Sequence, residues 1–369
     1  MKIERVELRM LRANLKFHFE TSFGVEENLQ KLLLVVHSEG LEGYGEVTAN
    51  RVPGYSYETS KVAWTALEDY ILPRVIGKEF ATPAQLVAAL EPIRGHDMAV
   101  AALEMAFWDL LAKAAHLPLW QLLGGVRTDI PVGASIGIQP SVEATVEAAR
   151  RHAAEGYKRL KFKIRPGWDV APLSAVREAL PEMALTVDAN SAYRITDARV
   201  FHQLDELDLD YVEQPLAHDD LVDHAELQAM LSTPICLDES VHSAADARKG
   251  LAIGAGRVIN VKLGRVRGHL GARRVHDVAA AFGAPVWCGG MLELGVGRAH
   301  NLHMSSLENY TLPGDTASAS RYWGDEDIVD QALDAVAGVQ QVPAEGPGLG
   351  VTLRQDLIER QTLDRLVVG

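Results

Sequence analysis

The chain has 369 residues, of which 47% are hydrophobic and 23% are charged, a composition typical of a folded protein with a large core and not of a disordered one. Its formal net charge is −14, so its average field repels polyanions and nucleic acid is not an expected partner. A small anionic substrate remains compatible, because a bound metal ion and a few lysines can reverse the field locally. The length predicts two domains, since a barrel needs roughly 200 to 250 residues.

The N-terminal segment is expected to be a strand and not a targeting signal. Residues 1–10 alternate charged and apolar side chains, as a strand does, and lack the apolar core of a signal peptide. No uninterrupted apolar run approaches the length needed to span a bilayer. We therefore expect a cytoplasmic protein with no membrane partner.

The first 125 residues are expected to form an α+β capping domain. Residues 1–47 alternate in polarity, which predicts a small antiparallel sheet. Residues 58–125 show helical periodicity and end in a pair of glycines that stops the last helix. The turns of the sheet are expected at Gly40, Gly43 and Gly45.

Residues 126–320 have the pattern of a catalytic barrel. Short β-branched runs alternate with helical stretches, which requires parallel strands joined by crossover helices. The number of repeats favours a closed barrel over an open doubly wound sheet, and neither GxGxxG nor GxxxxGK[ST] occurs. Residues 321–369 return to short strands and turns and are expected to pack back on the capping domain. The candidate strands are 132–136, 159–163, 184–188, 210–213, 235–238, 258–262 and 285–288.

Three acidic residues end successive candidate strands. Asp188, Glu213 and Asp238 are spaced 25 residues apart, and in a parallel barrel the carboxyl ends of neighbouring strands lie side by side. Converging carboxylates repel one another, and a divalent cation removes this conflict. An all-oxygen set suits Mg²⁺ or Mn²⁺ better than Zn²⁺. The alternative, in which each carboxylate only caps the following helix, accounts less well for the constant spacing.

Two lysine elements flank the acidic residues. Lys161 and Lys163 occupy positions i and i+2 of one strand, so both point to the same face. Lys262 ends another strand, 24 residues after Asp238. In barrel order, the two lysine strands lie on opposite sides of the acidic strands. Apolar neighbours predict that these lysines are buried, with their pKa values lowered toward neutrality by a metal ion and a second ammonium group.

A lysine of this kind can remove the proton α to a carboxylate, while a metal ion stabilises the resulting enediolate. With one lysine on each face, the proton can leave from one side and return on the other. This is racemisation.

The remaining titratable residues are interpreted more simply. Cys236 and Cys288 lie in apolar runs and are expected to be buried thiols without a disulfide. His300 and His303 have the i, i+3 spacing of a helix, which we expect to pack behind the last strands and not to bind metal. Arg265, three residues after Lys262, either depresses the pKa of that lysine or is exposed.

The motifs together resemble those of the muconate-lactonizing-enzyme subgroup of the enolase superfamily, over nearly the whole chain. This resemblance implies a modified (β/α)7β TIM-type barrel with an α+β N-terminal capping domain. Residues 19–24, 287–293 and 313–315 are further similar to the N-succinylamino acid racemase and o-succinylbenzoate synthase families. The motifs that carry the resemblance are Lys161-Phe-Lys163, Asp188-Ala-Asn190, Glu213-Gln-Pro215, Asp238-Glu239 and Lys262.

The resemblance implies a role for each central residue. Lys163 and Lys262 would be the acid/base pair, with Lys161 supporting Lys163 and the metal-bound substrate carboxylate. The implied cofactor is Mg²⁺, Mn²⁺ or another divalent cation. Its implied ligands are Asp188, Glu213 and Asp238, with Asn190 and Glu239 as further contacts around the metal.

The resemblance also implies a covered pocket for a small carboxylate substrate. A mobile loop at residues 19–24 and a second loop near Tyr55 would close over it. The residues implied to contact the substrate are Phe19, Tyr55, Ser135, Gly290 and Met291.

Racemisation of N-succinyl or other N-acyl amino acids is the leading functional hypothesis. The nearest alternative is o-succinylbenzoate synthase, a syn-dehydration in menaquinone synthesis with Lys163 as base and Lys262 as stabilising cation, and one protein can have both activities. Dipeptide epimerisation and cycloisomerisation are less favoured, because residues 290–291 offer no acidic partner for a dipeptide's ammonium group. A metal-binding protein that has lost catalysis is disfavoured by the presence of both lysines. We expect a homo-oligomer, as is common among such enzymes.

Overall fold

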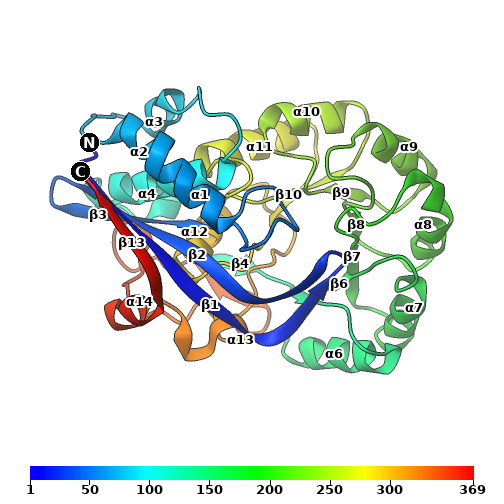
Figure 1. Cartoon of the computed structure of the whole chain (residues 1–369). Helices are drawn as coiled ribbons and strands as arrows, with labels where there is room; N and C mark the ends of the chain where they lie inside the picture. The colour runs from blue at the N-terminus through cyan, green and yellow to red at the C-terminus, as the bar shows by residue number, and fades with distance from the viewer.

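A computed structural model describes the backbone of residues 1–369 and every side chain except that of Glu27. It contains a four-stranded sheet and a curled seven-stranded sheet with helices on its outer side (Figure 1). This is the predicted combination of a capping sheet and a barrel. No helix among the described residues is long and apolar enough to span a bilayer.

The antiparallel sheet is formed by the two ends of the chain, which lie close together in Figure 1. Its strand order is β13-β1-β2-β3. Residues at the C-terminus therefore return to the first sheet, where Val6 pairs with Val368. The strands are β1 (Arg5–Thr21), β2 (Gly24–Ser38), β3 (Leu41–Val47) and β13 (Thr362–Val368).

The prediction that Gly43 and Gly45 mark turns is wrong. Both lie inside β3, and α4 (Asp97–Ala114) packs directly on that strand. A Cβ atom on Gly45 would lie only 1.9 Å from the carbonyl oxygen of Ala102 on α4. These glycines are therefore required by the close approach of a helix backbone and not by a turn.

Helices follow the sheet in the capping part of the chain. The longest, α4, is buried along most of its length because it lies between the antiparallel sheet and the rest of the chain. The last of them ends at Gly124, whose φ of 83° is the left-handed conformation expected of a glycine after a helix. The elements are α1 (Ser60–Ala66), η1 (Leu67–Ile71), α2 (Leu72–Val75), α3 (Pro83–Ala89), α4 and α5 (Leu119–Leu123).

The seven-stranded sheet is parallel, and its strand order β11-β10-β9-β8-β7-β6-β5 follows the chain without interruption. Helices alternate with these strands, as predicted, and α6 begins at the predicted cap Ser141 while α10 begins at Ser243. The strands are β5 (Ala134–Ile136), β6 (Arg159–Lys163), β7 (Ala184–Asp188), β8 (Tyr211–Glu213), β9 (Ile235–Leu237), β10 (Val258–Val261) and β11 (Val286–Cys288). The helices are α6 (Val142–Ala154), α7 (Val170–Ala179), η2 (Ile195–Asp197), α8 (Ala198–Asp205), α9 (Val222–Met230), α10 (Ala244–Ala252), α11 (His269–Ala281) and α12 (Gly295–Met304).

The segment 310–315 connects the two edges of this sheet. Tyr310 forms a parallel bridge with Val286 of β11, and Gly314 forms one with Val132, just before β5. The N–H of Asp315 then donates to the carbonyl oxygen of Cys288 at 2.9 Å. The segment occupies the position of an eighth strand, so the sheet closes as the predicted barrel does. The remaining elements are β4 (Asp129–Pro131), α13 (Ala319–Trp323), η3 (Gly324–Glu326), β12 (Val339–Gln341) and α14 (Gln355–Gln361).

The histidines of α12 are buried, as predicted for a helix behind the last strands. His303 Nδ1 accepts a hydrogen bond from the N–H of Trp120 at 3.0 Å, and its Nε2 lies 3.0 Å from the carbonyl oxygen of Leu349. His300 Nε2 lies 2.8 Å from the carbonyl oxygen of Tyr44 in β3. Because its Nδ1 accepts an N–H, His303 is neutral, and burial lowers the pKa of His300 to about 3. Both rings tie α12 to other parts of the chain. Cys236 and Cys288 are buried free thiols, as predicted.

Burial lowers the pKa of His303 from 6.5 to about 4. Between these values the unfolded chain binds more protons than the folded one, so the contribution of His303 is complete above pH 6.5 and is lost as the pH falls toward 4. We predict that the difference in free energy of unfolding between the wild type and His303→Gln shrinks by about 2 kcal/mol between pH 7 and pH 5. Chemical denaturation at the two pH values measures it, and a difference independent of pH would contradict this account.

Candidate active site

The predicted site residues lie at the carboxyl end of the barrel strands. Lys163 on β6 is in register with Asp188 on β7, and Asp188 is in register with Glu213 on β8. Asp238 directly follows β9, and Lys262 directly follows β10. Because side chains at i and i+2 of a strand share a face, this register brings the acidic and basic groups together inside the barrel.

Lys161 and Lys163 form one wall of the site. The Nζ atom of Lys161 lies 2.8 Å from Glu213 Oε2, 3.1 Å from Asp188 Oδ2 and 2.5 Å from Asp315 Oδ2. Lys163 Nζ donates to Asp188 Oδ2 at 2.6 Å and to Asn190 Oδ1 at 2.6 Å. The two lysines of β6 therefore share the carboxylate of Asp188.

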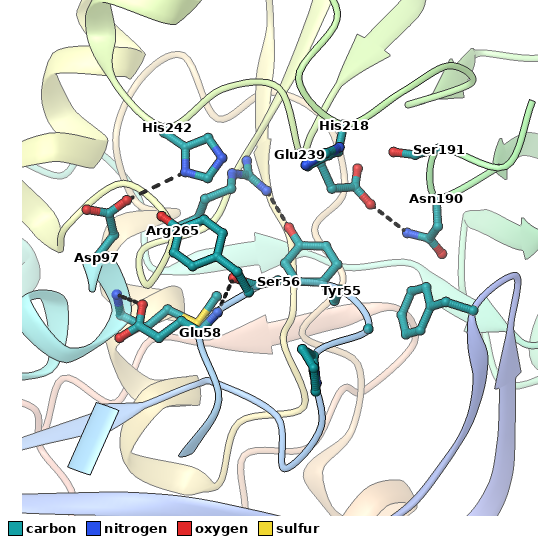
Figure 2. A pocket seen from close by; sticks show the side chains of 15 residues that line it. Tyr55, Ser56, Glu58, Asp97, Asn190, Ser191, His218, Glu239, His242 and Arg265 are labelled. Carbon is teal, nitrogen blue, oxygen red and sulfur yellow. Dashed lines mark hydrogen bonds and ion pairs between the residues drawn. The ribbon is translucent and has the colours of Figure 1, made fainter. Parts of the chain in front are cut away.

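Lys262 lies on the opposite wall. Its Nζ atom donates to Asp238 Oδ2 at 2.8 Å and to the Tyr55 hydroxyl at 3.0 Å. Arg265 is buried and pairs with Asp238. It also donates to the Tyr55 hydroxyl at 2.6 Å, a contact drawn in Figure 2. Its charge opposes the ammonium form of Lys262. Of the two alternatives for Arg265, the structure therefore supports an effect on the pKa of Lys262 and not exposure to solvent.

Asn190 and Glu239 lie beside the carboxylates, facing each other in Figure 2. Asn190 Nδ2 donates to Glu239 Oε1 at 3.1 Å, whereas Glu239 Oε2 is buried without a hydrogen-bond partner among the described side chains. Burial and the nearby Asp238 raise the pKa of Glu239 to about 8. The backbone of Asn190 has a φ of 41°, an unusual conformation for a residue other than glycine.

The lowered pKa values of Lys161 and Lys262 were predicted for a site that holds a metal ion, and they stay a prediction. Burial disfavours the ammonium form of both, but the facing carboxylates outweigh burial and hold both pKa values above their usual range. The prediction relied on a metal ion to neutralise the carboxylates. Without that charge, the acidic side chains act directly on the lysines.

Asp188, Glu213 and Asp238 can supply the oxygen ligands for a divalent cation. Burial and the neighbouring Asp188 raise the pKa of Glu213, as expected of carboxylates held close together. Their oxygens face amines instead of one another, and no ready-made metal cluster of acidic, histidine or cysteine side chains occurs among the described residues. The donor chemistry fits Mg²⁺ or Mn²⁺ once the ammonium groups withdraw.

The predicted pocket residues surround two small cavities next to these charges, each of about 60 Å³. A larger space of about 420 Å³ lies beyond Tyr55, whose side chain also lines the second small cavity (Figure 2). The acidic residues Glu293 and Asp315 line the first cavity, but they are engaged by the N–H of Met291 and by Lys161 respectively. The predicted residues Phe19, Ser135 and Gly290 line the first cavity, and Phe19, Tyr55, Gly290 and Met291 line the second.

Residues 19–24 form the tip of the β1–β2 hairpin and not a free loop. Phe19 pairs with Glu26, and Thr21 pairs with Gly24. The Phe23 ring packs so closely on Gly54 that a Cβ there would lie 2.9 Å from it. The hairpin tip and the segment containing Tyr55 thus contact each other over the pocket.

Two charged residues of the site were not predicted from the sequence. Asp315 was included only in a similarity motif and Arg159 only in a candidate strand, although Arg159 Nη1 donates to Asp315 Oδ1 at 2.7 Å. The sequence contains an indication of only one of these two residues. Arg159 precedes Lys161 by two residues on β6, so strand alternation places it on the same face, whereas no periodicity marks Asp315.

Comparison with known proteins agrees with this geometry. Residues 5–124 match the N-terminal domain of the mandelate racemase / muconate lactonizing enzyme family, and residues 144–357 match the enolase C-terminal domain-like family. The chain is 57% identical to N-succinylamino acid racemase of Thermus thermophilus, over 98% of each chain. It is 49% identical to o-succinylbenzoate synthase of Geobacillus kaustophilus, over 98% of this chain and 96% of the relative.

A solved structure supports the same assignment. The crystal structure of an enolase superfamily member from Listeria innocua superposes with a TM-score of 0.96 at 36% sequence identity, covering 100% of this chain and 99% of that one. Since both family domains, their order and the full-length relatives agree, the chain belongs to the mandelate racemase / muconate lactonizing enzyme family of the enolase superfamily.

Proposed function

We propose that this chain is a racemase that moves the proton α to the carboxylate of N-succinyl or other N-acyl amino acids. The observation that carries the proposal is the placement of Lys163 and Lys262 on opposite walls of one buried acidic centre. An amine on each side of a substrate is what a proton transfer through two bases requires. The identity of 57% with an N-succinylamino acid racemase supports the substrate class.

The roles that we propose come from the family resemblance and are compatible with the contacts. Lys163 Nζ would take the proton from one face of the α-carbon, and Lys262 Nζ would return a proton to the other face. Lys161 would remain an ammonium group beside Lys163. Asp188, Glu213 and Asp238 would hold Mg²⁺ or Mn²⁺, with Asn190 and Glu239 orienting them. When bound, such a cation supplies the positive charge that stabilises the anion left by proton removal.

The pocket walls would exclude water from this chemistry. Phe19, Tyr55, Gly290 and Met291 line the cavities beside the lysines, and Ser135 lines the same small cavity as Phe19. Two of these residues belong to the capping part of the chain. We accordingly propose residues 1–125 as the capping domain, 126–320 as the catalytic barrel and 321–369 as a segment that returns to the cap.

A second candidate is o-succinylbenzoate synthase, which the 49% identity with the Geobacillus kaustophilus enzyme favours. In that syn-dehydration, Lys163 would act as the base and Lys262 would remain a cation. The two activities make different demands on Lys262, since only racemisation needs it to exchange a proton.

We predict that Lys163→Ala and Lys262→Ala each lower racemisation by about 10²-fold or more, because each removes one of the two bases. In D₂O, Lys262→Ala should still exchange the α-hydrogen of the one enantiomer that faces Lys163, and Lys163→Ala should exchange only the other. Proton NMR with each pure N-succinyl amino acid measures this. Lys249→Ala, at an exposed lysine on α10, is the control. Loss of exchange for both enantiomers in both variants would contradict the assignment of one lysine to each face.

We also predict that Glu213→Gln abolishes the stabilisation of the fold by Mg²⁺. A cation present at a hundredfold excess over its Kd should raise the free energy of unfolding of the wild type by about 2.7 kcal/mol. The variant should show almost none of this increase in thermal unfolding with and without Mg²⁺. Glu104→Gln changes a buried glutamate that contacts Trp108 and α11 instead, and it should retain the full increase. An unchanged Mg²⁺ effect in Glu213→Gln would exclude Glu213 as a ligand.

A further inference from the structure

Asp315 is a buried carboxylate at the edge of the candidate active site that the mechanism above does not use. It follows the segment 310–314 that closes the barrel, and its N–H is fixed by the carbonyl oxygen of Cys288 at 2.9 Å. Its Oδ2 atom lies 2.5 Å from Lys161 Nζ.

Lys161 has three carboxylate partners, and they are not equivalent. Two of them, Asp188 and Glu213, are the proposed ligands of a divalent cation, whose oxygens must turn from the ammonium group to the cation when it binds. Asp315 is the one partner that Lys161 can keep in both states. Because an unpaired ammonium group buried in the barrel is costly, the availability of this partner decides where Lys161 rests when the cation is bound.

Asp315 is itself held in place from behind. Arg159 Nη1 donates to its Oδ1 atom at 2.7 Å, and Ser135 Oγ donates to Oδ2 at 3.2 Å. Arg159 is fixed by the carbonyl oxygens of Pro313 and Gly314, at 2.6 and 3.0 Å, and is almost fully buried. The carboxylate therefore has little freedom to follow Lys161 toward the acidic centre.

We infer that Asp315 is a positioning residue, which holds the Lys161 ammonium group off the oxygens of Asp188 and Glu213 so that a divalent cation can bind them. This inference rests on the proposed function, because it takes those carboxylates as metal ligands. It gives Ser135 a role in supporting Asp315 in addition to lining the pocket.

The consequence for metal binding is direct. In Asp315→Asn the side chain is neutral, and Lys161 retains only Asp188 and Glu213 as anionic partners. The ammonium group then competes with the cation for the same oxygens. Removing Lys161 as well removes the competitor, so metal affinity should return in the double variant Lys161→Met/Asp315→Asn. A residue that served only to stabilise the fold would not be rescued in this way.

The experiment is a titration of the metal-free protein with Mn²⁺, followed by electron paramagnetic resonance of the free ion, without substrate. Asp315→Asn should weaken binding by about tenfold or more, the size expected when a charge-assisted contact is lost. The double variant should bind within about threefold of the wild type. Asp210→Asn is the matched control, because Asp210 is also influenced by Arg159 but has no contact with Lys161, and it should bind as the wild type does.

Three results would overturn the inference. The first is equal Mn²⁺ affinity of Asp315→Asn and the wild type. The second is a double variant that binds Mn²⁺ as weakly as Asp315→Asn. Either result would leave the proposed function intact. Absence of Mn²⁺ binding by the wild type would overturn both the inference and the proposed metal centre. Thermal unfolding monitors the fold of each variant. Ser135→Ala, which removes only the hydrogen bond to Oδ2, is a milder second variant and should weaken binding about threefold.

Discussion

The structure depends on balancing many charges buried at the carboxyl end of one barrel. An isolated buried charge costs several kcal/mol, yet Asp188, Glu213 and Asp238 lie together with almost no exposure to solvent. They are tolerated because Lys161, Lys163, Lys262 and Arg265 face them from both sides. Because several of these groups share partners, as Lys161 and Lys163 share Asp188, the register of β6 to β10 and the chemistry of the site are fixed by the same contacts. A divalent cation would enter this balance as one more positive charge.

The capping sheet is tied to the pocket by a second set of buried charges. Lys31 of β2 is completely buried and donates to the carbonyl oxygens of Thr48 and Met291, both at 2.9 Å. Glu46 of β3 accepts the N–H groups of Leu294 and Gly297 at the start of α12. The segment that lines the pocket after β11 is thus held by side chains from the opposite end of the sequence. The same contacts therefore position the pocket wall after β11 and hold the two parts of the chain together.

Strand periodicity and spacing were sufficient to predict the barrel and to predict that the acidic residues and lysines meet at the ends of its strands. The constant spacing of Asp188, Glu213 and Asp238 reflects one strand and one helix per repeat, and a short-range pattern of that kind is visible in sequence. Gly43 and Gly45 were misinterpreted because glycine is needed there for close contact with α4, which lies far along the chain. Asp315 was missed for the same kind of reason, since its strand position consists of two isolated bridges. The raised lysine pKa values also depend on neighbours that only the folded structure brings together.

The most direct test of the central claim is a crystal structure of the protein soaked with Mn²⁺, with the metal located by its anomalous scattering. The account predicts one strong peak within about 2.0 to 2.3 Å of oxygens from Asp188, Glu213 and Asp238, with Lys161 Nζ displaced from Glu213 and still paired with Asp315. A peak elsewhere, or no peak while Lys161 keeps its contact with Glu213, would contradict it.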